Sequence, residues 1–351
     1  MFPYSNNLKK NLFSIQIELT DRCNLKCKHC YQGKLSKTKK ELDIYLVLTQ
    51  CKELSSFFKD KQILIRFSGG EPLLRDDIIS ILVNTHLHGF WTEIITNATL
   101  IDLEKSYGLR FSGLKFAQVS LDSGFESKND FIRGNGSYEK TLYGINNLIK
   151  SDISVSLKTT LMKGINTDYS DIKELFSLAL YFGIKSISFA RFLPLGRSKN
   201  NFDFILSPNE LNQTFKYIIE IGKNFPDIIF EIKEPLVNLL DEKFFPNNMI
   251  KTRCCIISKS YLAIGFDGKV YGCRRLNLPI GNIKKTTLSK IWFSGKKLKQ
   301  ITPGYKLPVE CINCNLKKKC LGGCKALSYS ITGDYNKIDP GCWNKNTLNL
   351  C

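Results

Sequence analysis

The chain has 351 residues, 43% hydrophobic and 24% charged, a composition typical of a globular protein that excludes a disordered or fibrous chain. Its 51 lysines and arginines outnumber 32 aspartates and glutamates, a net charge of +19, but these basic residues are dispersed and accompany no RNA-binding signature, so no nucleic-acid partner is expected. No apolar stretch approaches the roughly 18 residues of a membrane span. The start lacks a secretory signal, so we expect a cytoplasmic protein without membrane contact.

From about residue 12 the sequence alternates short β-branched runs with helical patterns. This alternation predicts right-handed crossovers and a parallel sheet, with six strand–helix units over residues 12–195. The predicted strands cover residues 13–19, 62–68, 92–96, 115–121, 153–161 and 186–192, and the predicted helices cover residues 41–58, 76–89, 137–150 and 168–182.

The second half of the chain differs from the first half in its sequence pattern. Ser207 and Pro208 open a further helix, with Glu210 reaching back as in a capping box. Beyond residue 251 short strands, glycine turns and clustered cysteines indicate a second, smaller domain. The expected organisation is an N-terminal arm (1–12), an α/β domain (13–200), a connector (201–250) and a cysteine-rich domain (251–351).

Thirteen cysteines, many closely spaced, indicate metal ligation rather than disulfides in a reducing compartment. Cys23, Cys27 and Cys30 form CxxxCxxC immediately after the first predicted strand. A structural zinc site requires four closed ligands. Three thiolates on a four-iron cluster leave one iron open to bind another group. The carboxyl end of a parallel strand is also where barrel enzymes place their chemistry.

The second motif is FSGGEPLL, residues 67–74, directly after the second predicted strand. Gly69 and Gly70 allow the backbone to approach a ligand closely, and Glu71 offers a carboxylate to an ammonium group. Together the two motifs resemble those of the radical S-adenosylmethionine (SAM) enzymes, over roughly residues 12–195. The resemblance implies a partial (β/α)6 TIM-type barrel.

The resemblance also implies site residues. A 4Fe-4S cluster would be held by Cys23, Cys27 and Cys30, and its open iron would bind SAM. Ser120 and Asp122 match the ribose-contacting pair, and alternation along a strand would let both side chains face the lumen. The remaining matches to SAM-binding positions are Gly69, Gly70, Glu71, His29, Arg133, Asn97 and Leu195.

The C-terminal cysteines follow the pattern CC-x12-GxxxxC, then CxxCxxxxxCxxxC, then a single Cys342. This pattern resembles the SPASM domain, an auxiliary-cluster extension of radical SAM enzymes that modify peptides. The resemblance implies an outer 4Fe-4S cluster on Cys311, Cys314, Cys320 and Cys342, and an inner one on Cys273, Cys324 and one or both of Cys254 and Cys255. Cys51 is interpreted as a packing residue and Cys351 as a free terminal thiol.

In this family the bound cofactors, and not protein side chains, supply the reactive species. Reductive cleavage of SAM would give a 5′-deoxyadenosyl radical, which abstracts a hydrogen atom from the substrate. The leading hypothesis is oxidation or cross-linking of a ribosomally made peptide, with a flavodoxin or ferredoxin as electron donor. About a dozen residues precede the first strand, so leader capture would need a separate protein or the basic surface.

Four arginines support a second hypothesis about the substrate. Arg274, followed by Arg275, stands where sulfatase-maturing relatives carry an aspartate directly after the GxxxxC cysteine, which disfavours that activity. With Arg191 and Arg197 they could line the substrate mouth and bind carboxylates. The alternative is therefore oxidative trimming of a carboxylate-bearing tetrapyrrole. A remote alternative is a non-catalytic iron–sulfur carrier or nucleic-acid binder, which would not need the Gly-Gly-Glu and Ser-x-Asp elements.

Overall fold

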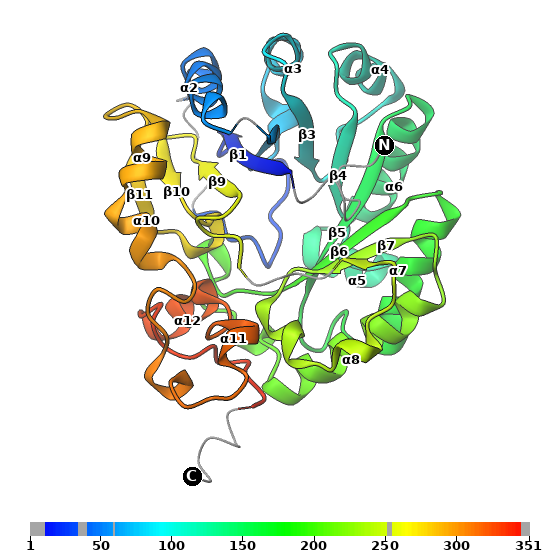
Figure 1. Ribbon diagram of the computed structural model, residues 1–351. Helices are drawn as coiled ribbons and strands as arrows, with labels where there is room; N and C mark the ends of the chain where they lie inside the picture. The colour runs from blue at the N-terminus through cyan, green and yellow to red at the C-terminus, as the bar shows by residue number, and fades with distance from the viewer. Residues whose placement is uncertain (1–10, 34–40, 59, 251–254, 345–351) are drawn as a thin grey trace.

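A computed structural model describes residues 11–33, 41–58, 60–250 and 255–344, so Cys254 and Cys351 lie outside the described residues. A sheet with the strand order β11–β10–β9–β1–β2–β3–β4–β5–β6–β7–β8 runs through the molecule and curls around its centre (Figure 1). Neighbours are parallel from β9 through β1 to β8, and β10 pairs antiparallel with β9 and β11. The strands are β1 (Leu12–Thr20), β2 (Gln62–Gly69), β3 (Trp91–Thr96), β4 (Phe116–Ser120), β5 (Ser154–Leu161), β6 (Ser186–Arg191), β7 (Ile229–Ile232), β8 (Met249–Ile250), β9 (Tyr261–Ile264), β10 (Lys269–Tyr271) and β11 (Pro279–Asn282).

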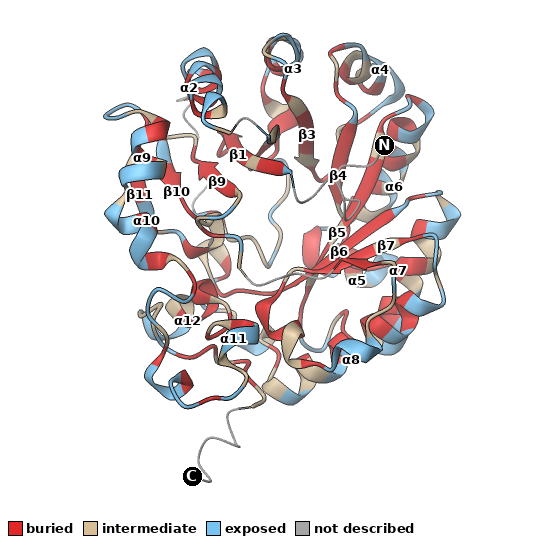
Figure 2. Ribbon diagram, in the orientation of Figure 1, coloured by how far each residue is buried: buried red, intermediate tan, exposed pale blue. Residues whose placement is uncertain are grey.

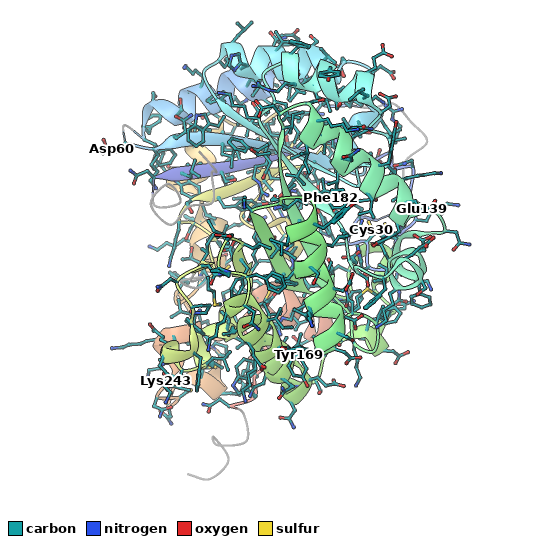
Figure 3. The ribbon with its side chains drawn as sticks, turned by 90° about the vertical axis from the view of Figure 1, so that its right-hand side faces the viewer. Cys30, Asp60, Glu139, Tyr169, Phe182 and Lys243 are labelled. Carbon is teal, nitrogen blue, oxygen red and sulfur yellow. The ribbon has the colours of Figure 1, made fainter. Side chains whose placement is uncertain are left out.

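Helices cover the outside of this sheet, and their solvent-facing sides are exposed (Figure 2). In the side view of Figure 3, Tyr169 and Phe182 mark the two ends of α7. No helix in the described ranges is both long and apolar enough to cross a membrane. The longer helices are α2 (Ile44–Ser56), α3 (Ile78–Leu87), α4 (Leu103–Phe111), α5 (Glu126–Arg133), α6 (Ser137–Lys150), α7 (Tyr169–Tyr181), α8 (Pro208–Lys223) and α12 (Lys325–Thr332); the shorter ones are α9 (Leu288–Ser294), α10 (Lys296–Ile301) and α11 (Lys317–Cys320).

Within the described ranges, seven 3-10 helices occur in the connections between these elements. They are η1 (Pro72–Leu74), η2 (Gly196–Ser198), η3 (Phe202–Phe204), η4 (Pro235–Leu239), η5 (Glu242–Phe244), η6 (Arg274–Leu276) and η7 (Val309–Cys311). Two of them, η1 and η2, lie next to predicted SAM-binding residues.

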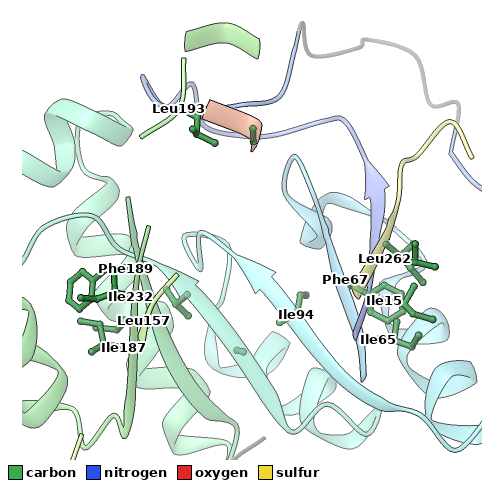
Figure 4. Packing of buried hydrophobic residues seen from close by; sticks show 14 of the residues in the cluster. Ile15, Ile65, Phe67, Ile94, Leu157, Ile187, Phe189, Leu193, Ile232 and Leu262 are labelled. Atoms are coloured by element: carbon green, nitrogen blue, oxygen red, sulfur yellow. The ribbon is translucent and has the colours of Figure 1, made fainter. Parts of the chain in front are cut away.

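The two faces of the strands differ in chemistry. Side chains that alternate along a strand point to opposite faces. On one face, apolar residues such as Ile15, Phe67 and Phe189 pack under the helices (Figure 4). Phe176 of α7, for example, stacks on Phe189 with ring centroids 5.9 Å apart. The opposite face carries the intervening side chains, many of them polar, such as Gln16, and this face lines a cavity inside the barrel.

The cysteine-rich domain joins the barrel through the sheet itself. Strand β9 pairs in parallel with β1, with Tyr261 opposite Ser14. Outside the sheet, Gln50 of α2 donates to the carbonyl of Ile283 (3.1 Å) and accepts from the amide of Leu288 (3.0 Å). These contacts hold the two parts of the chain in a defined relative position.

The six predicted strands and the predicted helices of residues 12–195 are confirmed, as is the α/β barrel class. The capping box is also confirmed, because the amide of Ser207 donates to Glu210 at 2.8 Å and the amide of Glu210 donates to the Ser207 hydroxyl. Sequence reasoning missed α4 and α5. Of their side chains, α4 buries Ser106 and Leu109, and α5 buries the polar Asn129 and Arg133 together with Ile132. Neither helix therefore has the apolar stripe that the periodicity argument requires.

Candidate cofactor and substrate site

A cavity of about 1110 Å³ lies within the curved sheet. Inward-facing residues of β1, β2, β4 and β5 form one part of its wall, and residues from the cysteine-rich domain form another. Small-molecule sites occupy roughly 300–1000 Å³. The cavity therefore has room for more than one bound group.

The loop after β1 places three thiols at this cavity. Cys23, Cys27 and Cys30 all line it, and Nη1 of Arg133 lies 4.0 Å from Sγ of Cys27. Burial raises the pKa of Cys23 to about 11 and also raises that of Cys27, where Arg133 opposes the effect. Metal binding would displace these protons, since the thiolate is the ligand form.

The donor set of this loop is three cysteine thiols, the ligand type that holds iron–sulfur clusters. Among the described residues, no three Cys, His, Asp or Glu side chains gather closely enough to hold one metal ion. Cys23, Cys27 and Cys30 all line the cavity, so a cluster held by them would face its interior. By their donor chemistry the residues fit an iron–sulfur cluster.

The Gly-Gly-Glu turn packs directly against this loop. The amide of Gly70 donates to the carbonyl of Thr20 and that of Glu71 to the carbonyl of Arg22, both at 2.8 Å. A Cβ on Gly70 would lie 2.0 Å from the Arg22 carbonyl oxygen, and one on Gly69, whose φ is +131°, would lie 2.2 Å from that of Thr20. Only glycine fits this approach. The turn thereby fixes the backbone just before Cys23.

The Glu71 carboxylate is already engaged by the protein. It accepts from the Thr96 hydroxyl (2.8 Å), the Asn97 amide (2.8 Å) and the Leu73 amide (3.2 Å). Burial raises its pKa to about 7, and these hydrogen bonds oppose the increase. Glu71 lines the cavity, but its first role in the structure is to tie η1 to the end of β3.

We expect Gly70→Ala to displace the turn, because the new methyl group overlaps a backbone carbonyl that cannot move independently. A displacement of about 1 Å in a positioning element can lower a rate on the order of 100-fold. The measurement is 5′-deoxyadenosine release from SAM. Gly33→Ala is the matched control, since a Cβ there meets nothing within 4 Å. Equal rates for the two variants would contradict this role.

His29, Asp122 and Arg133 form a buried group. Nε2 of His29 lies 2.5 Å, and Nε of Arg133 2.8 Å, from Oδ2 of Asp122, while Oδ1 accepts from the amide of Thr160 at 2.8 Å. Burial alone would raise the pKa of Asp122, but Arg133 and His29 outweigh it and hold the pKa below its usual range. Asp122 is therefore an anion held between two nitrogen groups.

This arrangement corrects the expectation that both Ser120 and Asp122 face the lumen. Ser120 lines the cavity, whereas Asp122 is fully buried behind the wall. Strand β4 ends at Ser120, so strict alternation no longer applies to Asp122. The residues that do face the cavity there are His29, Arg133 and Thr160, which the Asp122 carboxylate holds in place.

The remaining predicted SAM-binding residues divide in the same way. Asn97 lines the cavity, and its Nδ2 donates to Asn24 of the cysteine loop at 2.9 Å. Leu195 is not part of the wall but packs against the core. Its turn supports the cysteine loop instead, since a Cβ on the next residue, Gly196, would lie 2.1 Å from the carbonyl oxygen of Tyr31.

The C-terminal cysteines form two groups, and the described cysteines form no disulfide. Cys255, Cys273 and Cys324 line the cavity. Four other cysteines are buried together, away from the cavity. They lie close enough to affect one another: burial, and after it the three neighbouring thiols, raises the pKa of Cys311 to about 12. They are Cys311, Cys314, Cys320 and Cys342. The partition follows the grouping that the resemblance implies, with Cys254 outside the described residues.

Three of the four arginines expected at the substrate mouth are bound to carboxylates of the protein. Arg191 contacts both Glu234 and Asp339, Arg275 contacts Glu234, and Arg274 contacts Glu18 at 2.7 Å. All four arginines line the cavity, but the three paired ones are less free to bind a substrate. Nε of Arg197 is buried without a hydrogen-bond partner among the described residues.

Sequence reasoning missed the lumen residues Arg66, Gln118, Lys158, Glu231 and Lys233, which line the cavity. The available signal was a charged or amide side chain at alternate positions of an otherwise apolar strand, as in QILIRFS and SVSLKTTL. Because a polar side chain is costly to place in the apolar core under the helices, such a residue on a buried strand is expected to face the lumen.

Comparisons with known proteins agree with this geometry. Residues 17–179 match the family model of the radical SAM superfamily, and residues 254–315 match the iron–sulfur cluster-binding SPASM domain. An AdoMet-dependent heme synthase of Nitratidesulfovibrio vulgaris is 25% identical, over 93% of this chain and 90% of the relative. A PqqA peptide cyclase of Gluconobacter oxydans is 23% identical, over 94% and 90%. The structure of anSMEcpe with bound AdoMet aligns with a TM-score of 0.73 and 20% identity, over 96% of this chain and 95% of that chain.

Proposed function

Because the chain belongs to the radical SAM superfamily and carries a SPASM domain, we propose that it oxidises a carboxylate-bearing substrate bound in the lumen. The first candidate is a side chain of a tetrapyrrole. With SAM and a 4Fe-4S cluster bound, the cofactor pair would supply hydrogen-atom abstraction from an unactivated C–H bond. An auxiliary cluster on the C-terminal cysteines would accept the second electron as the carboxyl group leaves as CO2. Cys23, Cys27 and Cys30 would hold the cluster, and the Gly-Gly-Glu turn would receive the methionine end of SAM.

One observation carries the proposal. A single cavity is lined by the three-cysteine loop, by three C-terminal cysteines, and by nine lysines and arginines against two glutamates. Five of the nine cations are bound to carboxylates behind the wall. Of the others, Nζ of Lys158 and Nε of Arg197 have no hydrogen-bond partner among the described residues. The two glutamates are Glu71 and Glu231. A substrate between the two cysteine groups thus meets a wall rich in basic side chains, which favours carboxylates.

The protein's own residues would position the reactants. Asp122 fixes His29 and Arg133 at the cofactor end of the cavity. A substrate seated in the lumen would displace water from it, which would strengthen each charge interaction inside it. The similarity to an AdoMet-dependent heme synthase over nearly the whole chain supports the tetrapyrrole class.

The test uses the reconstituted enzyme with SAM, a reductant and iron-coproporphyrin III, whose four propionates supply the carboxylates. We expect 5′-deoxyadenosine release to depend on the tetrapyrrole, with a product that has lost a carboxyl group. The tetramethyl ester is the control, because it masks the carboxylates and keeps the ring. Equal stimulation by acid and ester, or by neither, would contradict the proposal.

Modification of a ribosomally made peptide is the second candidate. The similarity to a PqqA peptide cyclase favours it, as does the apolar stretch of cavity wall formed by Phe245, Pro246, Met249, Ile256 and Ile257. A flavodoxin or ferredoxin would supply electrons, and a separate protein could bind a leader. Stimulation of 5′-deoxyadenosine release by a precursor peptide, with none by the tetrapyrrole, would favour this candidate over the first.

A further inference from the structure

Lys158 occupies a central position in the lumen. It lies on β5, in register with Ser120 of β4 on one side and Ser188 of β6 on the other. Ser120 and Thr160 beside it also line the cavity, as do Glu231 and Lys233 two strands further along the sheet. A group bound to Lys158 would therefore lie within the lumen, next to the predicted SAM-binding residue Ser120.

The amine of Lys158 is buried and forms no hydrogen bond with the described part of the chain. Burial lowers its pKa well below the ordinary value, and the charges of Lys233 and Arg275 lower it further, against the opposing influence of Glu231 and Glu234. Glu234 is already bound to Arg191 and Arg275. A buried amine without a partner destabilises the fold unless a ligand satisfies it.

We propose that Lys158 is the anchor for a carboxylate of the substrate, which it binds at the centre of the lumen. This inference rests on the proposed function and names the contact that selects for a carboxylate. The ammonium would donate to the substrate oxygen, and the flanking Ser120 and Ser188 leave room because their side chains are short. The bound carboxylate would restore the protonated lysine, so binding takes up protons as the pH rises through the pKa of the free site.

The pocket chemistry favours an anion over other ligands. Arg66, another basic residue of the lumen, is bound to Glu93 and donates to Gln118 at 3.2 Å. Nζ of Lys158, by contrast, has no hydrogen-bond partner among the described residues. A neutral ligand would leave it so, whereas a carboxylate supplies both the acceptor and the charge.

The test is an absorbance titration of iron-coproporphyrin III into the reconstituted, unreduced enzyme with SAM present. We expect Lys158→Met to weaken binding about 10- to 100-fold, the effect of losing a hydrogen bond to a charged group. Lys158→Arg should retain most of the affinity. The control is Lys185→Met, an exposed lysine just before β6. Lys158→Met should be at least as stable to heat as the wild type without substrate, because it removes a buried charge.

The outcomes separate the two proposals. Tight binding by the wild type and by Lys158→Met alike would overturn the role of Lys158 and leave the proposed function standing. No binding by the wild type would contradict the proposed function, and the inference about Lys158 with it, before any variant is compared. A Lys158→Met protein that loses both affinity and thermal stability would indicate a structural role instead.

Discussion

Cys27→Ala should reduce SAM cleavage to the background rate, whereas Cys51→Ala should leave it unchanged. Cys27 lines the cavity beside Arg133, within the three-cysteine loop. Cys51 faces the core from α2 and is fully buried. Removal of a cluster ligand should abolish the reaction, while removal of a packed thiol should cost about 1 kcal/mol in the free energy of unfolding.

The measurement combines iron content after anaerobic reconstitution with 5′-deoxyadenosine release. Cys27→Ala should lose about the iron of one cluster, and Cys51→Ala should lose none. The two variants remove the same atom, so their comparison separates ligation from the general effect of losing a buried thiol. Full iron content and activity in Cys27→Ala would show that this cysteine is not a ligand.

Arg191→Met should produce the largest loss of stability among single substitutions in the cavity wall. Arg191 binds Glu234 (2.8 Å) and Asp339, and all three side chains are almost completely buried. Asp339 also accepts from the amide of Cys324 at 2.7 Å, so the ion group connects β6 to an expected cluster ligand. Breaking a buried pair leaves an uncompensated charge and costs about 3–5 kcal/mol.

Chemical denaturation of the reconstituted protein measures this cost. Lys163→Met is the matched control, because Lys163 and Glu210 form an exposed pair at 3.1 Å whose loss should cost less than about 1 kcal/mol. The double variant Arg191→Met/Asp339→Asn should be less destabilised than the sum of its two single variants, since neither partner then lacks the other. Additive effects would indicate that the two side chains do not depend on each other.

The sequence located the N-terminal part of the site and the C-terminal cysteines on different grounds. Cys23, Cys27 and Cys30 and the Gly-Gly-Glu turn follow the ends of β1 and β2 directly, and neighbouring parallel strands end at the same edge of a sheet. Their proximity therefore followed from strand order alone. The partition of the C-terminal cysteines followed from the resemblance to a known pattern, and the described residues are grouped accordingly.

The sequence pattern could not predict which polar side chains pair with one another. Asp122 looked like a lumen residue by alternation, but β4 ends two residues earlier and the carboxylate turns to His29 and Arg133. Arg191 looked like a ligand for substrate carboxylates, but its partner Asp339 is 148 positions away in the chain. Such pairings depend on how the cysteine-rich domain docks on the barrel, which no local signal encodes. Lys158 could have been noticed as a charge within a buried strand.

The most direct test of the proposed hydrogen abstraction uses iron-coproporphyrin III deuterated in its propionate side chains. The reconstituted enzyme is turned over with SAM and a reductant, and the 5′-deoxyadenosine is analysed by mass spectrometry. If the lumen holds a carboxylate-bearing side chain against the cofactor, one deuterium should appear in each 5′-deoxyadenosine molecule that accompanies product. Release of 5′-deoxyadenosine without deuterium, from an unchanged tetrapyrrole, would contradict the account.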